Sequence, residues 1–350
     1  MTKADTTVLV IAGGDSPERD VSLDSSQGIA VALRDAGYRV LVADPSRPDI
    51  TPTEDDAEIF THAGINTEPP EVEDDFTDRA EFTRILTGYQ SYGIDVVFNG
   101  LHGGAGEDGT IQAVMEYLGL PFTGSRAAGS ALAMDKHRSK HLAAAAGVPV
   151  PRGIRFERSA LATGTLEPMV RETMSLPLVV KPNAQGSSVG LSIVHDFAAI
   201  DEAAAAAFAV DTAILVEEYI EGREITLAYL EGQERIPVLE IRPKSGLYDY
   251  RHKYQSGHSE YLVPAPIDES VAQAVAQSTR QVVHALDLSI YGRVDYRLNA
   301  DGQHYLLEAN TLPGMTSTSL VPKMCAAIGV DYVELCDRIV RLSLSRGGGS

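Results

Sequence analysis

An Asp-Gly dipeptide near the end of this chain restricts its local fold more tightly than any other feature of the sequence. Asp301–Gly302 favours a two-residue turn, and the flanking residues of GRVDYRLNADGQHYLLEANTLPG are typical of strands. Residues that lie the same number of positions before and after such a turn are cross-strand neighbours, so the turn fixes the register of the hairpin. This register predicts that Asp295 lies opposite Glu308 and that Arg293 lies opposite Asn310.

Strand alternation places these four polar side chains on one face of the hairpin. The opposite, core-facing side is expected to comprise Val294, Tyr296, Leu298, Tyr305, Leu307 and Ala309. Leu306 then falls on the polar face, where it is out of place. Two opposed carboxylates repel each other unless a cation lies between them. Oxygen ligands from Asp, Glu and Asn suit Mg²⁺ bound with nucleotide phosphates, and Arg293 would stabilise developing negative charge. The alternative is a solvated face on which Arg293 and Arg297 neutralise the acids.

The composition narrows the class of protein. The chain has 350 residues, more than one core usually holds, so two or three domains are expected. A formal net charge of -20 disfavours binding to nucleic acid or to an anionic membrane surface. The two cysteines, Cys325 and Cys336, match no zinc spacing. Neither a signal-peptide pattern nor a membrane-spanning apolar run is found, so the cytoplasm is the expected location.

The chain opens with alternating strand and helix patterns. Residues 7–12 and 39–43 are expected to form strands on either side of a helix, which predicts a parallel sheet. Residues 45–80 are rich in Pro, Asp, Glu and Thr and are expected to form an irregular, exposed insertion. We therefore expect a first α/β domain over residues 1–124.

The remainder is expected to form two further units, over residues 125–220 and 221–346, with a flexible tail at 347–350. Residues 242–262 form a long polar stretch without periodicity. Loops of that length inside a domain are usually functional lids.

A small-residue loop, PNAQGSSVG, follows a predicted strand that ends at Lys181. Such loops let backbone N–H groups approach phosphate oxygens, and the Ser187 and Ser188 hydroxyls add donors. Lys181 would neutralise a phosphate, although no Gly-Lys-Ser/Thr sequence completes a Walker A loop. Lys136 lies near a helix start, where the helix dipole disfavours a cation, and this hints at a role outside the helix. The alternatives are an ordinary turn and a surface lysine.

Two further loops follow strands of the first domain. One contains Glu18, and the other is glycine-rich and contains His102. Ligands bind at the carboxyl ends of strands in open α/β sheets, so both loops should open on the same edge. Glu18 would hold a substrate ammonium group there, and the alternative is a carboxylate that merely starts a helix.

Taken in order, these segments resemble the D-alanine–D-alanine ligase family of the ATP-grasp superfamily. The resemblance runs from about residue 8 to 342 and is densest in GGDSPERDVS, LHGGAGEDGTIQ, MDKHRSK, VVKPNAQGSSVG, VEEYIEGREIT, LYDYRHKY, GRVDY and LLEANTLPGMTSTSLVP. It implies an α/β protein with three domains. An N-terminal parallel-sheet domain would precede two α+β ATP-grasp subdomains that hold ATP between them.

The resemblance also implies roles for individual residues. Those implied to bind ATP are Lys136, Lys181, Ser187, Ser188, Glu217, Glu218, Tyr219, Ile220, Glu224 and Lys253. The two lysines Lys136 and Lys181 would contact phosphates, residues 217–220 would line the adenine pocket largely through backbone, and Glu224 would take the ribose. Two Mg²⁺ ions, replaceable by Mn²⁺, would be held by Asp295, Glu308 and Asn310.

The amino-acid substrates are implied to bind beside the nucleotide. The first D-alanine would lie at Glu18 and His102, and the carboxylate of the second at Ser319, at a helix start, with Ser317 nearby. Residues implied to act in catalysis are Glu18, Ser187, Tyr254, Arg293 and Gly314. The first three would form a link that closes the lid, and the last two would stabilise a tetrahedral intermediate.

The implied reaction has two steps. A D-alanine carboxylate attacks the γ-phosphate of ATP, and the amine of a second D-alanine then displaces phosphate from D-alanyl phosphate. Its partners are D-alanine and ATP, and a homodimer is left open. The sequence departs from the family pattern in residues 45–80 and in QSGHSEY after Tyr254.

Two alternatives are kept. The first is another ATP-grasp carboxylate–amine or carboxylate–hydroxyl ligase, such as a D-alanine–D-lactate ligase, and Tyr254 in the lid segment argues against it. A nucleotide-binding protein without turnover is disfavoured because the catalytic set is intact, namely Lys181, Arg293, Asp295, Glu308 and Asn310.

Overall fold

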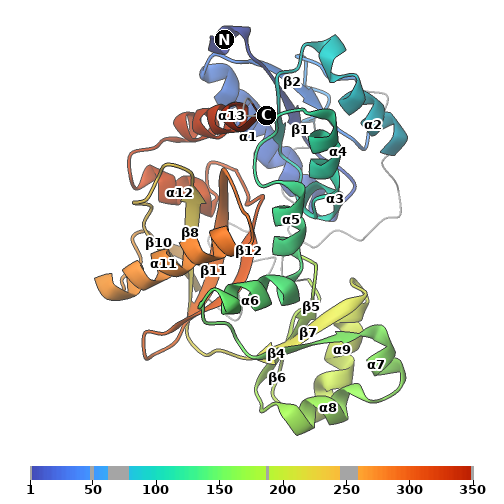
Figure 1. Cartoon of the computed structure of the whole chain (residues 1–350), viewed down its shortest axis with the longest axis vertical. Coiled ribbons are helices and arrows are strands. Elements are labelled where there is room, and N and C mark those ends of the chain that lie inside the picture. The colour runs from blue at the N-terminus through green and yellow to red at the C-terminus, as the bar shows by residue number, and fades with distance from the viewer. Residues whose placement is uncertain (1, 48–50, 62–78, 187–188, 245–258, 348–350) are drawn as a thin grey trace.

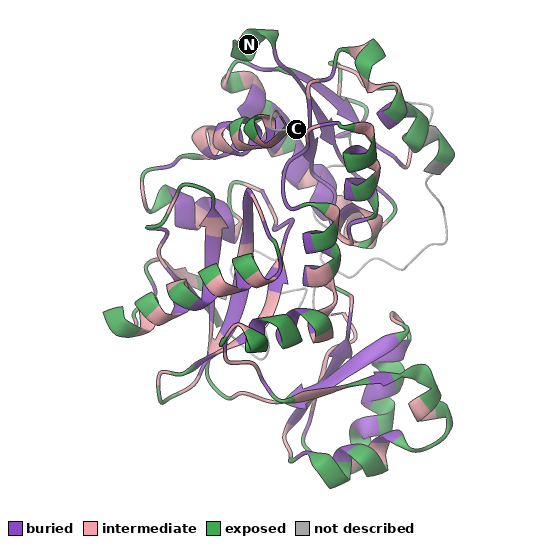
Figure 2. Cartoon of the chain, in the orientation of Figure 1, coloured by how far each residue is buried: buried purple, intermediate pink, exposed green. Residues whose placement is uncertain are grey.

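The computed structural model describes residues 2–47, 51–61, 79–186, 189–244 and 259–347. Three β-sheets organise the described chain, and Figure 1 shows them one above another, linked by helices α5 and α6. Figure 2 shows that the strands are largely buried, whereas the outer faces of the helices are exposed. The mixed α/β, three-sheet architecture confirms the fold class expected from the sequence.

The first sheet is parallel throughout, as predicted. Its strand order is β2-β1-β3, with β1 (Thr7–Ile11), β2 (Arg39–Ala43) and β3 (Val96–Asn99). Its helices are α1 (Arg19–Asp35), α2 (Arg79–Thr87), α3 (Gly104–Glu107) and α4 (Thr110–Leu118). The strands are apolar on both sides, which is typical of a parallel sheet covered on both faces.

Part of the segment expected to be an exposed insertion packs onto this sheet instead. Thr53 pairs with Val42, and the side chains of Ile59 and Phe60 are buried in the core. The expectation of exposure was therefore wrong for residues 51–61, because two apolar side chains in a polar segment suffice to anchor it.

Two helices lead from the first sheet to the rest of the chain, α5 (Ala127–Met134) and α6 (Lys136–Ala145). The second sheet is antiparallel, in the order β4-β7-β5-β6. Its strands are β4 (Gly153–Glu157), β5 (Leu178–Pro182), β6 (Ser192–Val194) and β7 (Ala213–Glu218). Helices α7 (Arg158–Ala162), α8 (Leu166–Thr173) and α9 (Ile200–Phe208) bury an apolar cluster against it.

The third sheet is also antiparallel, in the order β10-β9-β8-β11-β12. Its strands are β8 (Arg223–Leu230), β9 (Leu239–Pro243), β10 (Ser259–Leu262), β11 (Tyr291–Leu298) and β12 (His304–Asn310). Helices α11 (Glu269–Ala285), α12 (Leu320–Ala326) and α13 (Tyr332–Gly347) complete this region, and α13 returns to pack against α1 of the first domain.

The β11–β12 hairpin corrects one sequence-based expectation and explains another. Leu298 pairs with His304, so the connection is longer than the two-residue turn predicted at Asp301–Gly302. A bulge next to Asp295 then shifts the register by one and restores its pairing with Glu308.

The same bulge decides which side chains of β12 face the core. Leu306 pairs with Tyr296 and is fully buried, so it belongs to the core face. Leu307 is the additional residue, and it lines a cavity together with the acidic side chains. The core positions assigned to Leu307 and to the half-buried Tyr305 were therefore wrong, because simple alternation fails across a bulge.

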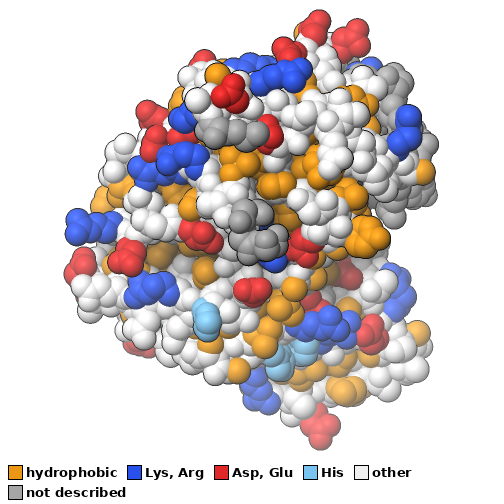
Figure 3. All heavy atoms as spheres, turned by 45° about the horizontal axis from the view of Figure 1, so that its top comes forward, with side chains coloured by type: hydrophobic (Ala, Val, Ile, Leu, Met, Phe, Trp, Pro, Cys, Tyr) orange, Lys and Arg blue, Asp and Glu red, His pale blue; other side chains and the backbone are white. Residues whose placement is uncertain are grey.

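The strong negative charge of the chain is not gathered into one region of the face shown in Figure 3. Acidic and basic side chains are interspersed there among apolar and neutral ones. None of the described helices is long and apolar enough to span a membrane.

Candidate active site

A cavity lies between the second and third sheets, and we call it the inter-sheet cavity. Its walls come from β5, β6 and the end of β7 on one side and from β8, β9, β11 and β12 on the other. The sequence-predicted ATP-binding residues that line it are Lys136, Lys181, Glu217, Glu218, Tyr219, Ile220 and Glu224. Ser187, Ser188 and Lys253 lie outside the described residues. Segments far apart in sequence therefore converge here as expected.

Three buried charges stand at one wall of the inter-sheet cavity. The Lys181 Nζ lies 2.5 Å from the Glu217 Oε1, and the Nζ of Lys140, on α6, donates to the Glu217 Oε2. Burial tends to raise the pKa of Glu217, but the two lysines outweigh it and hold that pKa below its ordinary value. Glu217 thus contributes a buried, ion-paired side chain, whereas the sequence analysis assigned residues 217–220 a role largely through backbone.

Lys136 reaches the same cavity from the first turn of α6. Its Nζ donates to the Gln185 carbonyl at 2.7 Å and lies 3.2 Å from the Glu308 Oε2. The backbone N–H of Lys136 also donates to the Asn183 carbonyl, which ties the helix start to the small-residue loop. Lys136 is only 6% exposed, so the alternative of a surface lysine is excluded.

The opposed carboxylates of the hairpin are each paired with a cation. Arg293 donates to both oxygens of Asp295, with distances of 2.8 Å each, and the Thr226 hydroxyl donates to the same carboxylate at 2.6 Å. Glu308 pairs with Lys136 as described. Arg293 therefore neutralises Asp295 as the solvated-face alternative holds, but both side chains are largely buried rather than solvated.

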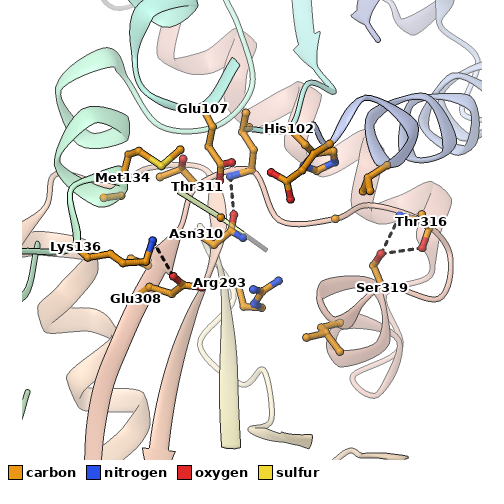
Figure 4. Close-up of a pocket in the computed structure, with 18 of the residues that line it drawn as sticks. His102, Glu107, Met134, Lys136, Arg293, Glu308, Asn310, Thr311, Thr316 and Ser319 are labelled. Carbon is orange, nitrogen blue, oxygen red and sulfur yellow. Dashed lines mark hydrogen bonds and ion pairs between the residues drawn. The ribbon is translucent and has the colours of Figure 1, made fainter. Parts of the chain in front are cut away.

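A second cavity adjoins the first, and we call it the loop-lined cavity. Figure 4 shows it between the loops of the first domain and the segment that follows β12. Glu18, His102, Glu107, Gly314 and Ser319 line it. Lys136, Arg293 and Glu308 line both cavities, so the two spaces meet at these three side chains.

The first-domain loops bring two ionisable side chains together as the strand-edge argument predicted. Glu18 immediately precedes α1, and His102 follows β3. Burial lowers the pKa of His102, while Glu18 and a hydrogen bond to the Leu312 backbone oppose that shift. The imidazole Nε2 lies 3.4 Å from the Ser25 hydroxyl. The ring is thus held in place by contacts on several sides.

Glu107 also lines the loop-lined cavity, although the sequence analysis assigned it no role. Burial raises the pKa of its carboxyl to about 7, and the nearby Glu18 adds to the shift. The Gly103 N–H donates to its Oε2 at 3.1 Å. The sequence feature that could have identified Glu107 is its position in GAGEDG, between the His102 loop and helix α4.

The opposite end of the loop-lined cavity is formed by residues just before α12. Ser319 precedes the helix, and its Oγ accepts a hydrogen bond from the Thr316 N–H at 3.1 Å. Gly314 lies beside it, and a Cβ at that position would come within 3.1 Å of the Ser319 hydroxyl. Ser317 is exposed and does not line either cavity.

The predicted lid at 242–262 lies mostly outside the described residues. Tyr254, like Ser187, falls outside them. The link from Glu18 through Ser187 to Tyr254 therefore stays a prediction. Asn310 is placed, and its Oδ1 accepts the Leu312 N–H at 3.1 Å.

Comparison with known proteins decides the family. The family model for the D-ala D-ala ligase N-terminus matches residues 7–125, and the model for the D-ala D-ala ligase C-terminus matches residues 142–341. The chain belongs to the D-alanine–D-alanine ligase family. It is therefore an ATP-dependent ligase with the ATP-grasp fold.

Solved structures agree with this membership. The D-alanine–D-alanine ligase from Bacillus anthracis is 30% identical, with a TM-score of 0.75 over 98% of this chain and 99% of its own. A structure of the Bacillus anthracis enzyme complexed with ATP matches equally well, at 28% identity and a TM-score of 0.75. The VanG D-Ala:D-Ser ligase from Enterococcus faecalis is 28% identical, with a TM-score of 0.78 over 97% of this chain and 99% of its own. Ligases with different second substrates thus share this fold.

Proposed function

We propose that this ligase joins two D-alanine molecules into D-alanyl-D-alanine through D-alanyl phosphate, releasing ADP and phosphate. The observation that carries the proposal is the meeting of the two cavities at Lys136, Arg293 and Glu308. A nucleotide in the inter-sheet cavity and amino acids in the loop-lined cavity would have their reactive ends at this junction. The dipeptide would serve peptidoglycan precursor synthesis.

The inter-sheet cavity is the proposed site of ATP. Lys136 and Lys181 would take the phosphates, and Glu224 would take the ribose, while the backbone of 217–220 would face the adenine. Two buried lysines supply the charge that a triphosphate requires in a chain that is acidic overall. The three separate sheets support the proposed domains, 1–124, 125–220 and 221–346.

Mg²⁺ is the proposed metal, with two ions bound together with ATP. The donors Asp295, Glu308 and Asn310 are all oxygen ligands, which suits a hard cation. Among the described residues, no group of three or more His, Cys, Asp and Glu side chains forms a metal site by itself. The fit therefore needs phosphate oxygens to complete the coordination, as is usual for Mg²⁺. Bound there, the metal would neutralise charge on the transferring phosphoryl group.

The first D-alanine is proposed to bind at Glu18 and His102. The Glu18 carboxylate would accept hydrogen bonds from the substrate ammonium, and the substrate carboxylate would then point toward the junction. Glycines surround Glu18 closely, because a Cβ at Gly103 would lie 2.8 Å from its Oε2 and one at Gly186 would lie 3.3 Å away. Side chains at these two positions would therefore crowd the Glu18 carboxylate, and glycine keeps it accessible.

The second D-alanine is proposed to bind near Ser319. Its carboxylate would accept hydrogen bonds from the Ser319 hydroxyl, and its amine would attack the carbonyl carbon of D-alanyl phosphate. Arg293 and the Gly314 N–H would stabilise the oxyanion of the tetrahedral intermediate, from which phosphate leaves. The amine must lose a proton before it attacks, in contrast to a hydroxyl acceptor.

D-Serine is the second candidate for the acceptor. The similarity to the VanG D-Ala:D-Ser ligase favours it, since the two structures superpose over nearly their whole lengths. The two acceptors differ by one hydroxyl group, and both would present a carboxylate to Ser319 and an amine to the carbonyl carbon.

One competition experiment tests the proposal. The protein is supplied with ATP, Mg²⁺ and equal concentrations of D-alanine, D-serine and D-lactate, with L-alanine as the control donor. Phosphate release is measured, and the products are identified by mass spectrometry between pH 6 and 9. Mostly D-alanyl-D-alanine is expected. A majority of D-alanyl-D-serine or D-alanyl-D-lactate at neutral pH would reassign the acceptor. Absence of phosphate release would contradict the proposed reaction.

A further inference from the structure

Lys140 is a buried cation with no place in the proposed reaction. It lies four residues after Lys136 on α6, so both lysines project from the same side of the helix. Lys136 lines both cavities, whereas Lys140 lines neither of the two. With 4% exposure, Lys140 is as buried as the lysines that face the nucleotide cavity. Burying a lysine is costly, so a contact must repay it.

The contact is the carboxylate of Glu217. Lys140 occupies the Oε2, and Lys181 lies 2.5 Å from the Oε1, so each lysine has its own oxygen. Glu217 pairs with Val179 across β5 and β7, which puts it diagonally next to Lys181 on one sheet face. Glu217 is 2% exposed, so its carboxylate depends mainly on these two lysines for hydrogen bonds.

The two lysines differ in electrostatic character. Burial works to lower the pKa of Lys181, but the carboxylates of Glu217 and Glu308 outweigh it and raise that pKa above its ordinary value. Burial lowers the pKa of Lys140 to about 7, with Glu217 opposing the shift and Lys181 adding to it. The site thus favours the charged form of Lys181 at the cavity wall, while Lys140 behind it is placed to donate to Glu217.

We propose that Lys140 is a positioning residue for nucleotide binding. It occupies one carboxylate oxygen of Glu217, so that the other oxygen holds Lys181 at the cavity wall. This inference rests on the proposal that the inter-sheet cavity binds the ATP phosphates. Without Lys140, both oxygens of Glu217 turn to Lys181, because a buried carboxylate oxygen needs a donor. The tighter pair neutralises the Lys181 ammonium and draws it away from the phosphates.

The test compares ADP with adenosine, which differ only in the phosphates. Binding of each to Lys140→Met is measured by calorimetry, and Arg138→Met serves as the matched control, because that side chain is on the same helix and 73% exposed. Lys140→Met should weaken ADP binding by about fivefold or more and leave adenosine binding nearly unchanged. The KM for ATP should rise, and the KM for D-alanine should stay the same. Arg138→Met should bind both ligands as the wild type does.

A double variant separates positioning from packing. If Lys140 acts through the Glu217 charge, Lys140→Met combined with Glu217→Gln should recover most of the lost ADP affinity, and Lys140→Met should change little in the Glu217→Gln background. Additive losses, or equal losses for ADP and adenosine, would overturn the inference. This comparison stays informative if Lys140→Met alone does not fold. Wild-type protein that binds neither ligand would instead defeat the proposed nucleotide site.

Discussion

Asp295 and Glu308 face each other across the β11–β12 hairpin, and each carboxylate is held by a different cation. Arg293 donates to both oxygens of Asp295, while Lys136 lies 3.2 Å from Glu308. The two cations come from different parts of the chain, Arg293 from the hairpin itself and Lys136 from α6. This arrangement relieves the repulsion between the carboxylates at the junction of the two cavities, where metal and phosphates are proposed to enter.

Glu308→Gln should remove the proposed metal site and leave the fold intact. The substitution replaces an anionic oxygen ligand with a neutral amide of the same shape, so kcat should fall by about 100-fold or more. Mn²⁺ binding in the presence of ADP, followed by electron paramagnetic resonance, measures the effect directly. Glu334→Gln, on α13 and paired with Arg338 and Arg341 away from both cavities, is the control. Unchanged Mn²⁺ binding in Glu308→Gln would refute the cross-strand site.

The pairing of Asp295 with Glu308 could be predicted from sequence, but the path of the chain between them could not. The Asp-Gly dipeptide indicated a hairpin, and the longer connection and the bulge shift the register in opposite directions. Leu306, apparently misplaced in a regular strand, was the sign of the bulge. A bulge depends on how the hairpin packs within the third sheet, which local sequence does not encode.

In the candidate site, too, some features could be predicted from sequence and others could not. Loops that follow strands could be placed on one edge of a sheet, so Glu18 and His102 were expected together. The motif MDKHRSK contains Lys140 as well as Lys136. Only the structure reveals that Lys140 turns toward Glu217, 77 residues away, because this contact depends on how α6 docks onto the second sheet. Ser317 and Ser319 could not be distinguished from sequence. The structure shows that Ser319, directly before α12, lines the cavity and that Ser317 is exposed.

Arg346→Ala should destabilise the protein by loosening the C-terminal helix from the first domain. The guanidinium donates to the carbonyl oxygens of Gly124 at 2.6 Å and Phe122 at 2.7 Å, and its carbon lies 4.9 Å from the Phe122 ring centroid. Its loss leaves two carbonyl groups without their donor, so the free energy of unfolding should fall by roughly 2–4 kcal/mol.

The control for this variant is Arg341→Ala on the same helix. Arg341 is 54% exposed and pairs with Asp337 at 3.0 Å, so its removal should cost less than about 1 kcal/mol. Denaturant unfolding of both variants, followed by circular dichroism, gives the comparison. Equal destabilisation by the two substitutions would show that the carbonyl contacts of Arg346 contribute nothing specific.

Glu107 should make stability depend on pH within a defined window. Burial and the proximity of Glu18 raise the pKa of its carboxyl from 4.5 to about 7, and Glu308 adds to the shift, while the Gly103 N–H and Lys136 oppose it. Between these two values the folded protein holds a proton that the unfolded chain has released. The stability contributed by protonated Glu107 is therefore fully present below about pH 4.5 and is lost as pH rises through 7. Glu107→Gln carries a permanently neutral side chain of similar shape and lacks this dependence.

The unfolding midpoint of Glu107→Gln, relative to the midpoint of the wild type, should thus increase from pH 5 to pH 7 and level off above pH 8. Thermal melts of both proteins at these pH values provide the measurement. A difference that stays constant from pH 5 to pH 8 would mean that the folded state does not retain the Glu107 proton.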